Sequence, residues 1–392
     1  MTSRLRRIAA IVPLLLLFSA VLLGAHWYLL DRLVFDPALA EPWRTLVIAA
    51  VVVLAVSIVA EPIAGRTLAP SRARFIAWPA ALWMGLAFLL LLLCLATDLA
   101  LWLFDSPAMA ATADLQAARD ASGGRALAVV LVALALAAAG MVSALRPPQL
   151  RRVRFEIEGW PRALEGFRIA QLSDIHFGPI LGRAFADHLV TRVGALAPDL
   201  IAFTGDLADG DAALLADEVA PLGKLRARHG VYFVTGNHDH YSGASAWSSF
   251  AARLGMRVLR NERVSIGEGD ESFDLVGVDD AHASLAGGGR EDLERALAGR
   301  DARRPAVLLA HDPTTFRRAR RAGIDLQLSG HTHGGQIWPF RYAVRLVVPW
   351  VEGAHRDGRA QLYVSRGTGF WGPPMRLFAP AEITEITLVR AS

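Results

Sequence analysis

Five short blocks in the second half of the chain contain seven residues whose side chains commonly bind metal ions. The blocks are Asp174-Ile-His176, Gly205-Asp206-Leu-Ala-Asp209, Gly236-Asn237-His238-Asp239, His311-Asp312 and Gly330-His331-Thr-His333-Gly334-Gly335. Carboxylate, amide and imidazole groups suit divalent manganese, iron or zinc, and one carboxylate can bridge two ions because it has two oxygens. The residue types therefore predict metal chemistry.

Each block follows a short apolar run that resembles a β-strand. We predict strands at 168–172, 200–204, 231–235, 273–278, 306–310 and 326–329, with helices at 181–196, 212–228 and 292–298. Alternating strands and helices indicate an α/β layered domain, and ligands of such domains collect beyond the carboxyl ends of the strands. We therefore expect the five blocks to converge on one site, with the adjacent glycines allowing tight turns.

The ordered set of blocks resembles the calcineurin-like metallophosphoesterase superfamily, whose pattern is D-x-H, GD-x-x-D, GNH[DE], a lone His and GH-x-H. The resemblance covers about 169–336, and the 367–382 tail is similar to the bacterial, membrane-associated branch. It implies a fold of two mixed β-sheets flanked by helices, with the metal site at the strand ends.

The resemblance also implies roles for the ligands. Asp174, His176, Asp206 and His333 would hold a first ion, and Asp206 would bridge to a second. Asn237, His311 and His331 would complete the coordination of the second ion. Two divalent ions, with manganese favoured over iron or zinc, can activate a water and stabilise in-line displacement at phosphorus. The expected reaction is metal-assisted hydrolysis of a phosphoric ester or anhydride.

Two further residues match the catalytic positions of the superfamily. His238 resembles the residue that protonates the leaving oxygen, because an imidazole titrates near neutrality. Asp209 matches the carboxylate that orients this histidine, although a helix cap is the alternative. Asp239 is expected to support the turn.

The first 146 residues differ in composition from the rest, and they account for much of the 53% hydrophobic content of the chain. About 20 apolar residues cross a bilayer core of roughly 30 Å as a helix. We predict an all-helical membrane region at 1–146, with spans near 8–30, 43–61, 75–97 and 126–145. The phosphoesterase domain would occupy 147–392, starting at Pro147-Pro148, where proline ends the last helix.

Arginines predict the orientation of the spans, because positive residues near span ends stay in the cytoplasm. They precede the first span, lie between the second and third, and follow the fourth at 146–154. The other two connections carry mainly acids, including Asp105, Asp114 and Asp120. We therefore expect a multi-pass protein of the bacterial inner membrane with a cytoplasmic catalytic domain. An export signal at Arg6-Arg7 is disfavoured, because no A-x-A cleavage site follows.

Other features bear on partners. Cys94 is the only cysteine, so an intramolecular disulfide is excluded. The net charge of +4 is modest and gives no case for nucleic acid. We expect a phosphate-containing substrate and contact with the bilayer, and no oligomeric state is predicted.

Several alternatives for the substrate and function remain open. The resemblance extends to enzymes that cleave UDP-linked diacylglucosamine, so a lipid pyrophosphate is the leading substrate, beside soluble nucleotides or other phosphodiesters. The rival interpretation is a sensor or transport-related protein with a regulatory or inactive phosphoesterase module. The spans carry almost no charge apart from Asp98, which disfavours transport.

The remaining features have two interpretations each. The apolar stretch at 337–351 is either a β-hairpin on the core or a membrane-facing lip beside the metals. Arg366 and Arg376 could clamp a phosphate or lie on the surface. Histidines outside the motifs, including His240 and His282, are expected to pack in the core or on the surface.

Overall fold

The computed structural model describes residues 3–104, 115–283 and 289–391. The chain divides into two compact units, one formed by 1–63 and 76–139 and the other by 64–75 and 140–392. Asp105 and Asp114, which contributed to the predicted orientation, lie outside the described residues.

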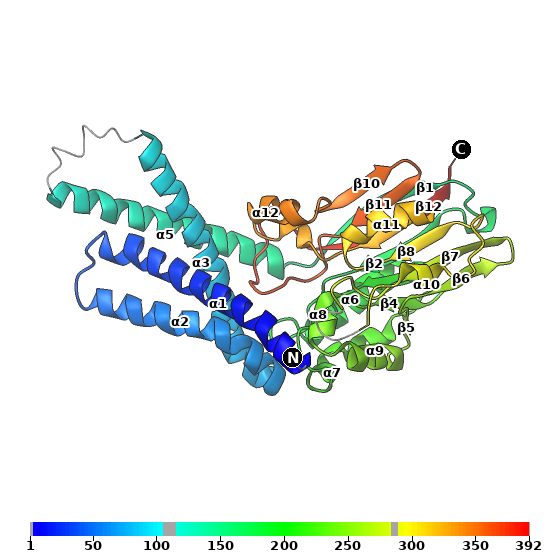
Figure 1. The fold of residues 1–392 in the computed structure, drawn as a ribbon, viewed down its shortest axis with the longest axis horizontal. Coiled ribbons are helices and arrows are strands. Elements are labelled where there is room, and N and C mark those ends of the chain that lie inside the picture. Colours follow the sequence, from blue (N-terminus) through cyan, green and yellow to red (C-terminus); the bar gives the residue numbers. More distant parts are fainter. Residues whose placement is uncertain (1–2, 105–114, 284–288, 392) are drawn as a thin grey trace. The chain divides into compact units, whose positions relative to one another are not determined.

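Four long helices make up the first unit (Figure 1). They are α1 (Ser3–Leu30), α2 (Trp43–Thr67), α3 (Pro70–Phe104) and α5 (Leu115–Leu145), with a π-helical turn at Asp31–Phe35 after α1. Stretches at 16–35, 43–67, 70–104 and 119–145 are long and apolar enough to cross a membrane, as predicted. Apolar side chains face outward, among them Leu23, Val53 and Trp102. Such surfaces suit a hydrocarbon environment.

Asp98, the charged exception among the predicted spans, is ion-paired within the first unit. Its carboxylate accepts hydrogen bonds from Arg32 Nε at 2.9 Å and from Tyr28 Oη at 2.7 Å. Arg32 also contacts Asp36 at 2.6 Å. Pairing accounts for this charge without a transport pathway.

The second unit contains two six-stranded mixed sheets (Figure 1). In spatial order the first sheet is β1 (Gln149–Ile157), β12 (Glu382–Arg390), β2 (Phe167–Leu172), β3 (Leu200–Thr204), β4 (Val231–Val234) and β5 (Arg257–Val258). The second is β10 (Gly353–Asp357), β11 (Ala360–Val364), β9 (Leu326–Ser329), β8 (Ala306–Leu309), β7 (Glu271–Gly277) and β6 (Glu262–Glu268). The central strands β2 to β5 and β7, β8, β9 and β11 run parallel within their sheets.

Helices cover the outer faces of both sheets. Those over the first sheet are α6 (Arg183–Leu196), α7 (Ala212–Val219) and α9 (Ala244–Arg253), and those over the second are α10 (Leu293–Leu297) and α11 (Phe316–Ala319). Two short helices, α8 (Asn237–Tyr241) and α12 (Phe340–Val347), complete the unit. The predicted fold of two mixed sheets flanked by helices is confirmed.

Strand β3 shows why the predicted runs become central strands. Ile201 and Phe203 pack under the helices, whereas Leu200 and Ala202 pack between the sheets. A strand buried on both faces is apolar at every position, because its side chains alternate between two cores.

Two predicted elements differ in the structure. The predicted helix at 212–228 is shorter, because α7 ends at Val219 and a 3₁₀ segment containing Pro221 follows. The β-hairpin interpretation of the 337–351 stretch is wrong, because Phe340–Val347 forms α12. No residue of α12 is buried, so no sheet core fixes its periodicity.

The core between the sheets predicts a large mutational effect. Phe273 is fully buried against Trp160 and Phe167, with ring centroids 4.8 and 5.4 Å away. Phe273→Ala should lower the free energy of unfolding by about 3–5 kcal/mol, because it leaves a cavity. Phe378→Ala, at a side chain 76% exposed, is the control and should change it by roughly 0.5 kcal/mol or less. Denaturant unfolding of the full chain in detergent measures both, and equal losses would contradict the packing described.

Candidate metal centre

All seven predicted ligands come together beyond the carboxyl ends of β2, β3, β4, β8 and β9. Six of them, together with His238, form three overlapping groups whose ligand atoms lie within 4.8 Å of one another: Asp174, His176 and His333; His176, Asp206 and His238; and Asp206, His311 and His331. Asn237 joins them through its side-chain oxygen, 2.9 Å from His331 Nδ1 and 3.2 Å from His311 Nε2. The five blocks thus converge on one site at the strand ends, as expected.

The ligand-bearing turns have an unusual backbone. Asp174, His176, Asp206, His331 and His333 all have positive φ angles, between 51° and 73°. Non-glycine residues seldom adopt this left-handed region, and such strain is typical of functional sites held by their surroundings. In the D-x-H and H-x-H blocks, the two ligands are thus brought to the same side by a turn and not by an extended strand.

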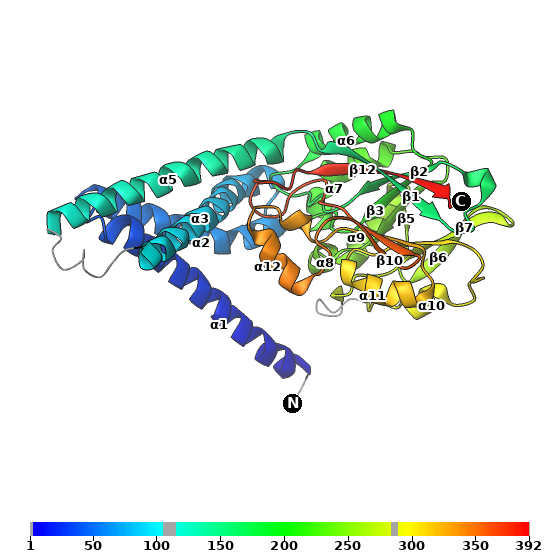
Figure 2. The same cartoon turned by 90° about the horizontal axis from the view of Figure 1, so that it is seen from above.

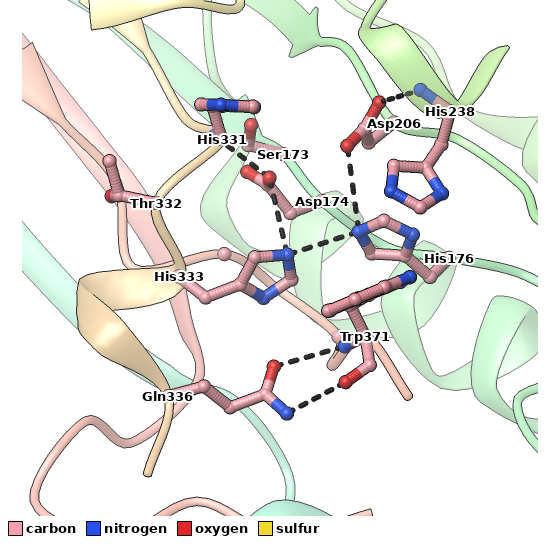
Figure 3. Close-up of polar contacts among 12 residues, drawn as sticks. Ser173, Asp174, His176, Asp206, His238, His331, Thr332, His333, Gln336 and Trp371 are labelled. Carbon is pink, nitrogen blue, oxygen red and sulfur yellow. Dashed lines mark hydrogen bonds and ion pairs between the residues drawn. The ribbon is translucent and has the colours of Figure 1, made fainter. Parts of the chain in front are cut away.

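One half of the centre is formed by Asp174, His176 and His333 (Figure 3). His176 Nε2 lies 3.0 Å from His333 Nε2 and 3.7 Å from Asp206 Oδ2. His333 Nε2 lies 3.5 Å from Asp174 Oδ1. Asp174 Oδ2 is buried and has no hydrogen-bond partner among the described residues. Imidazole nitrogens that face each other beside an unpartnered carboxylate oxygen fit a shared cation.

The other half is built around His311. Its Nδ1 donates a hydrogen bond to the Thr204 carbonyl oxygen at 2.8 Å, which leaves Nε2 as the free nitrogen. That nitrogen lies 3.1 Å from Asp206 Oδ2 and 3.3 Å from His331 Nδ1. Asp206 thus contacts ligands of both halves, as a bridging carboxylate would.

Electrostatics agree with a cation-binding role. Burial alone would raise the pKa of Asp206, but His311 and His238 hold it well below the ordinary value. Burial, with His176 and Arg376 nearby, lowers the pKa of His333. Asp206 in turn raises the pKa of His311 well above its ordinary value against the effect of burial, and a bound cation would take the place of that proton, because metal binding requires an ionised carboxylate and neutral imidazoles. The residues present therefore fit a pair of divalent ions.

His238 and Asp209 lie beside the ligands. Asp209 Oδ1 is 2.7 Å from His238 Nδ1, and its Oδ2 is 3.1 Å from His176 Nδ1. Burial lowers the pKa of His238, yet the Asp209 and Asp206 carboxylates outweigh it and raise that pKa to about 9. The predicted helix-cap alternative for Asp209 is wrong, because Asp211 caps α7.

Asp239 supports the turn, as expected. Its carboxylate accepts hydrogen bonds from the backbone N–H groups of Gly236, Asp206 and Leu207, at 2.8, 2.9 and 2.9 Å. One buried side chain thereby ties the turn after β4 to the turn after β3.

Arg376 has neither of the two roles considered for it, and Arg366 is a partly buried side chain held in an ion pair. Arg376 is fully buried, and it donates to the carbonyl oxygens of Gly369 and Ala379 and lies 3.3 Å from His333 Nδ1. Burial lowers its pKa to about 10. Arg366 is ion-paired with Glu382 at 2.7 Å. Neither is a surface arginine, and Arg376 has no donor left for a phosphate.

Two side chains near the centre were not singled out from the sequence. The His282 ring stacks on His331 with centroids 5.8 Å apart, between Asp280 and Asp312. The Trp371 ring lies 5.6 Å from His238, held by Gln336, which bonds its backbone N–H and carbonyl groups (Figure 3). No spacing signal marks either, because each reaches the centre from a separate loop. His240, in contrast, is buried and bonds Thr235.

The comparisons with known proteins agree with this site. The family model described as calcineurin-like phosphoesterase matches residues 167–335. The chain is 33% identical over 245 residues to an uncharacterized metallophosphoesterase of Aquifex aeolicus, covering 61% of this chain and 91% of that protein. The chain is also 33% identical to the uncharacterized metallophosphoesterase YkuE of Bacillus subtilis, covering 58% of this chain and 81% of that protein.

A longer relative shares the membrane character. The chain is 41% identical over 274 residues to the transmembrane protein with metallophosphoesterase domain of Bos taurus, covering 67% of this chain. It spans 62% of the length of the cattle and zebrafish relatives. The chain therefore belongs to the calcineurin-like metallophosphoesterase family.

Glycine packing gives a test of the centre. A Cβ atom at Gly330 would overlap Ser173 Oγ and Asp174 Oδ2. Gly330→Ala should therefore displace a ligand and weaken metal binding at least tenfold, which is about 1.4 kcal/mol. Gly194, in α6, has open space around its Cα, so Gly194→Ala is the control. Isothermal titration of the metal-stripped full chain with Mn²⁺ measures the change. Equal affinities of the two variants would contradict the assigned packing.

Proposed function

We propose that the chain is a membrane-anchored, metal-dependent phosphoesterase that hydrolyses a phosphodiester or pyrophosphate bond. The observation that carries this proposal is the position of Asp206, which lies between His311 of one half and His176 of the other. An inactive module would not need seven ligands in one place, five of them in strained turns. The geometry therefore supports an enzyme over a regulatory domain.

The two halves would hold the two ions as the sequence implies. Asp174, His176, Asp206 and His333 would hold one, and Asp206, Asn237, His311 and His331 the other. When bound, such a pair neutralises phosphate oxygens and lowers the pKa of a coordinated water. Manganese is the first ion to test, because mixed oxygen and imidazole ligands suit it along with iron and zinc.

The protein side chains would handle the proton of the leaving group. His238, whose side chain is 21% exposed and is held by Asp209, would give a proton to the departing oxygen. Asp209 fixes the ring through Nδ1, so Nε2 is the nitrogen available for that transfer. The Trp371 ring lies against the His238 ring.

A lipid-linked substrate is the leading specific proposal, with UDP-diacylglucosamine as the example. It is supported by four helices of membrane-spanning length and by the exposed aromatic Trp371 beside His238. We further propose that the protein lies in the bacterial inner membrane with this unit in the cytoplasm. This orientation is supported by the arginine pattern and by the assignment of residues 64–75 and 140–145 to the phosphoesterase unit, which would bring both arginine-flanked connections to one side of the membrane.

Removal of the bridging ligand tests the activity. Asp206→Ala should reduce Mn²⁺-dependent hydrolysis of bis-p-nitrophenyl phosphate by about 10³-fold or more, because it removes a ligand of both ions. The exposed Asp301→Ala is the control and should keep full activity. Full-length protein in detergent is used, since helix ends form part of the phosphoesterase unit. Equal rates for wild type and Asp206→Ala would refute the proposal.

A second test isolates the role of His238. His238→Asn should slow hydrolysis of an alkyl phosphodiester by about 10²-fold or more, because an alkoxide needs a proton to leave. Nitrophenolate leaves without one, so bis-p-nitrophenyl phosphate should lose less than about tenfold. His229→Asn, at the start of β4 and away from the centre, is the control. Equal losses for both substrates would argue against proton donation by His238.

A further inference from the structure

Helix α12 has two distinct faces. Arg341 and Arg345 are four residues apart and lie on one side of the helix. The other positions are Phe340, Tyr342, Ala343, Val344, Leu346 and Val347, which form a broad apolar face. The helix is therefore amphipathic.

The apolar face of α12 is exposed, whereas an amphipathic helix in water usually buries that face. Arg341, on the arginine side, bonds Glu352 at 2.8 Å, and its backbone lies against Gly335. Tyr342, Leu346 and Val347 are 60%, 88% and 79% exposed. Soluble amphipathic helices bury the apolar side, so this face requires an apolar partner. Figure 2 shows α12 at the edge of its unit, outside both sheets.

Neighbouring loops extend the apolar face. Trp338 and Phe378 are 49% and 76% exposed, with ring centroids 6.3 Å apart. Ile337 and Leu377 join these two loops through a β-bridge. We call Trp338, Tyr342, Leu346, Val347 and Phe378 the apolar rim. It directly follows the His333–Gly335 turn of the metal centre in sequence.

The end of α5 indicates what covers the rim. Residues 140–145 belong to the same unit, and the Gly140 carbonyl accepts a hydrogen bond from Arg376 N at 2.9 Å. Gly140 also lies against the Leu377 side chain, next to Phe378. Leu377, next to the rim residue Phe378, thus lies against the C-terminal part of a helix of membrane-spanning length. A bilayer surface is the apolar partner nearest to that point.

The composition of the rim suits the bilayer interface. Tryptophan and tyrosine concentrate there because their rings combine an apolar body with a polar group. Arg345 is exposed and has no ion pair among the described residues, so it can meet anionic headgroups. Interfacial helices bury their apolar face by about 5–10 Å.

We propose that the apolar rim inserts into the interface of the bilayer that the long helices span, with the metal centre beside it. The consequence of insertion rests on the proposed function: the enzyme would act on phosphate groups that are presented at the membrane surface. Insertion itself requires no catalysis. A second copy of the chain is the alternative occupant of the rim.

Site-directed spin labelling tests the proposal on the full chain. Cys94 is the only cysteine, so Cys94→Ala gives a background for Leu346→Cys or, as a second position, Val347→Cys. The labelled protein is placed in nanodiscs of phosphatidylcholine and phosphatidylglycerol. Accessibility of the label to oxygen should exceed that to a water-soluble nickel chelate, because oxygen concentrates in lipid. Arg303→Cys, at a side chain 91% exposed, is the control and should show the reverse.

Two outcomes would overturn the proposal. Labels at 346 and 347 that are as accessible to nickel as the label at 303 would place the rim in water. Labels protected from both reagents would indicate a protein contact, as between two copies. The measurement needs no substrate, so a rim embedded in lipid on a chain without hydrolase activity would refute the proposed function alone.

Discussion

The buried carboxylate of Asp206 is the group on which the site depends. Its Oδ1 accepts a hydrogen bond from the backbone of His238, and its Oδ2 lies 3.1 Å from His311 Nε2. A buried charge is costly unless cations or donors surround it. The carboxylate therefore requires that the turns after β3, β4 and β8 meet at one point. The two parallel-stranded sheet centres provide that arrangement, because their carboxyl ends face the same cluster.

Much of this arrangement can be predicted from the sequence, since it depends on local patterns. Strands β3 and β9 have the bounds expected from their apolar runs, which end at the polar turn residues. The ligand blocks converge because short turns leave them little freedom. Arg376 shows the limit of such prediction. Its burial depends on the carbonyl groups of Gly369 and Ala379, which the fold brings together. No residue spacing in the sequence predicts these contacts.

Helix α12 was harder to predict for a different reason. Periodicity predicts an element when its apolar side faces the protein core. In α12 the arginine side contacts Glu352, and the apolar side faces outward. A run of aromatic and β-branched residues then resembles a strand. The β-hairpin interpretation of 337–351 is thus wrong for the same reason that the rim is exposed: the apolar side of α12 does not face the protein core.

The long helices contribute to the site as well as to membrane attachment. Gly210, just after Asp209, lies against the carbonyl oxygen of Gly65 at the end of α2. Gly140 of α5 accepts the backbone hydrogen bond of Arg376, whose side chain lies against His333. The two helix ends therefore pack behind two different loops of the metal centre. Truncation at Pro147 would remove both contacts, so the helix ends are structural parts of the phosphoesterase unit.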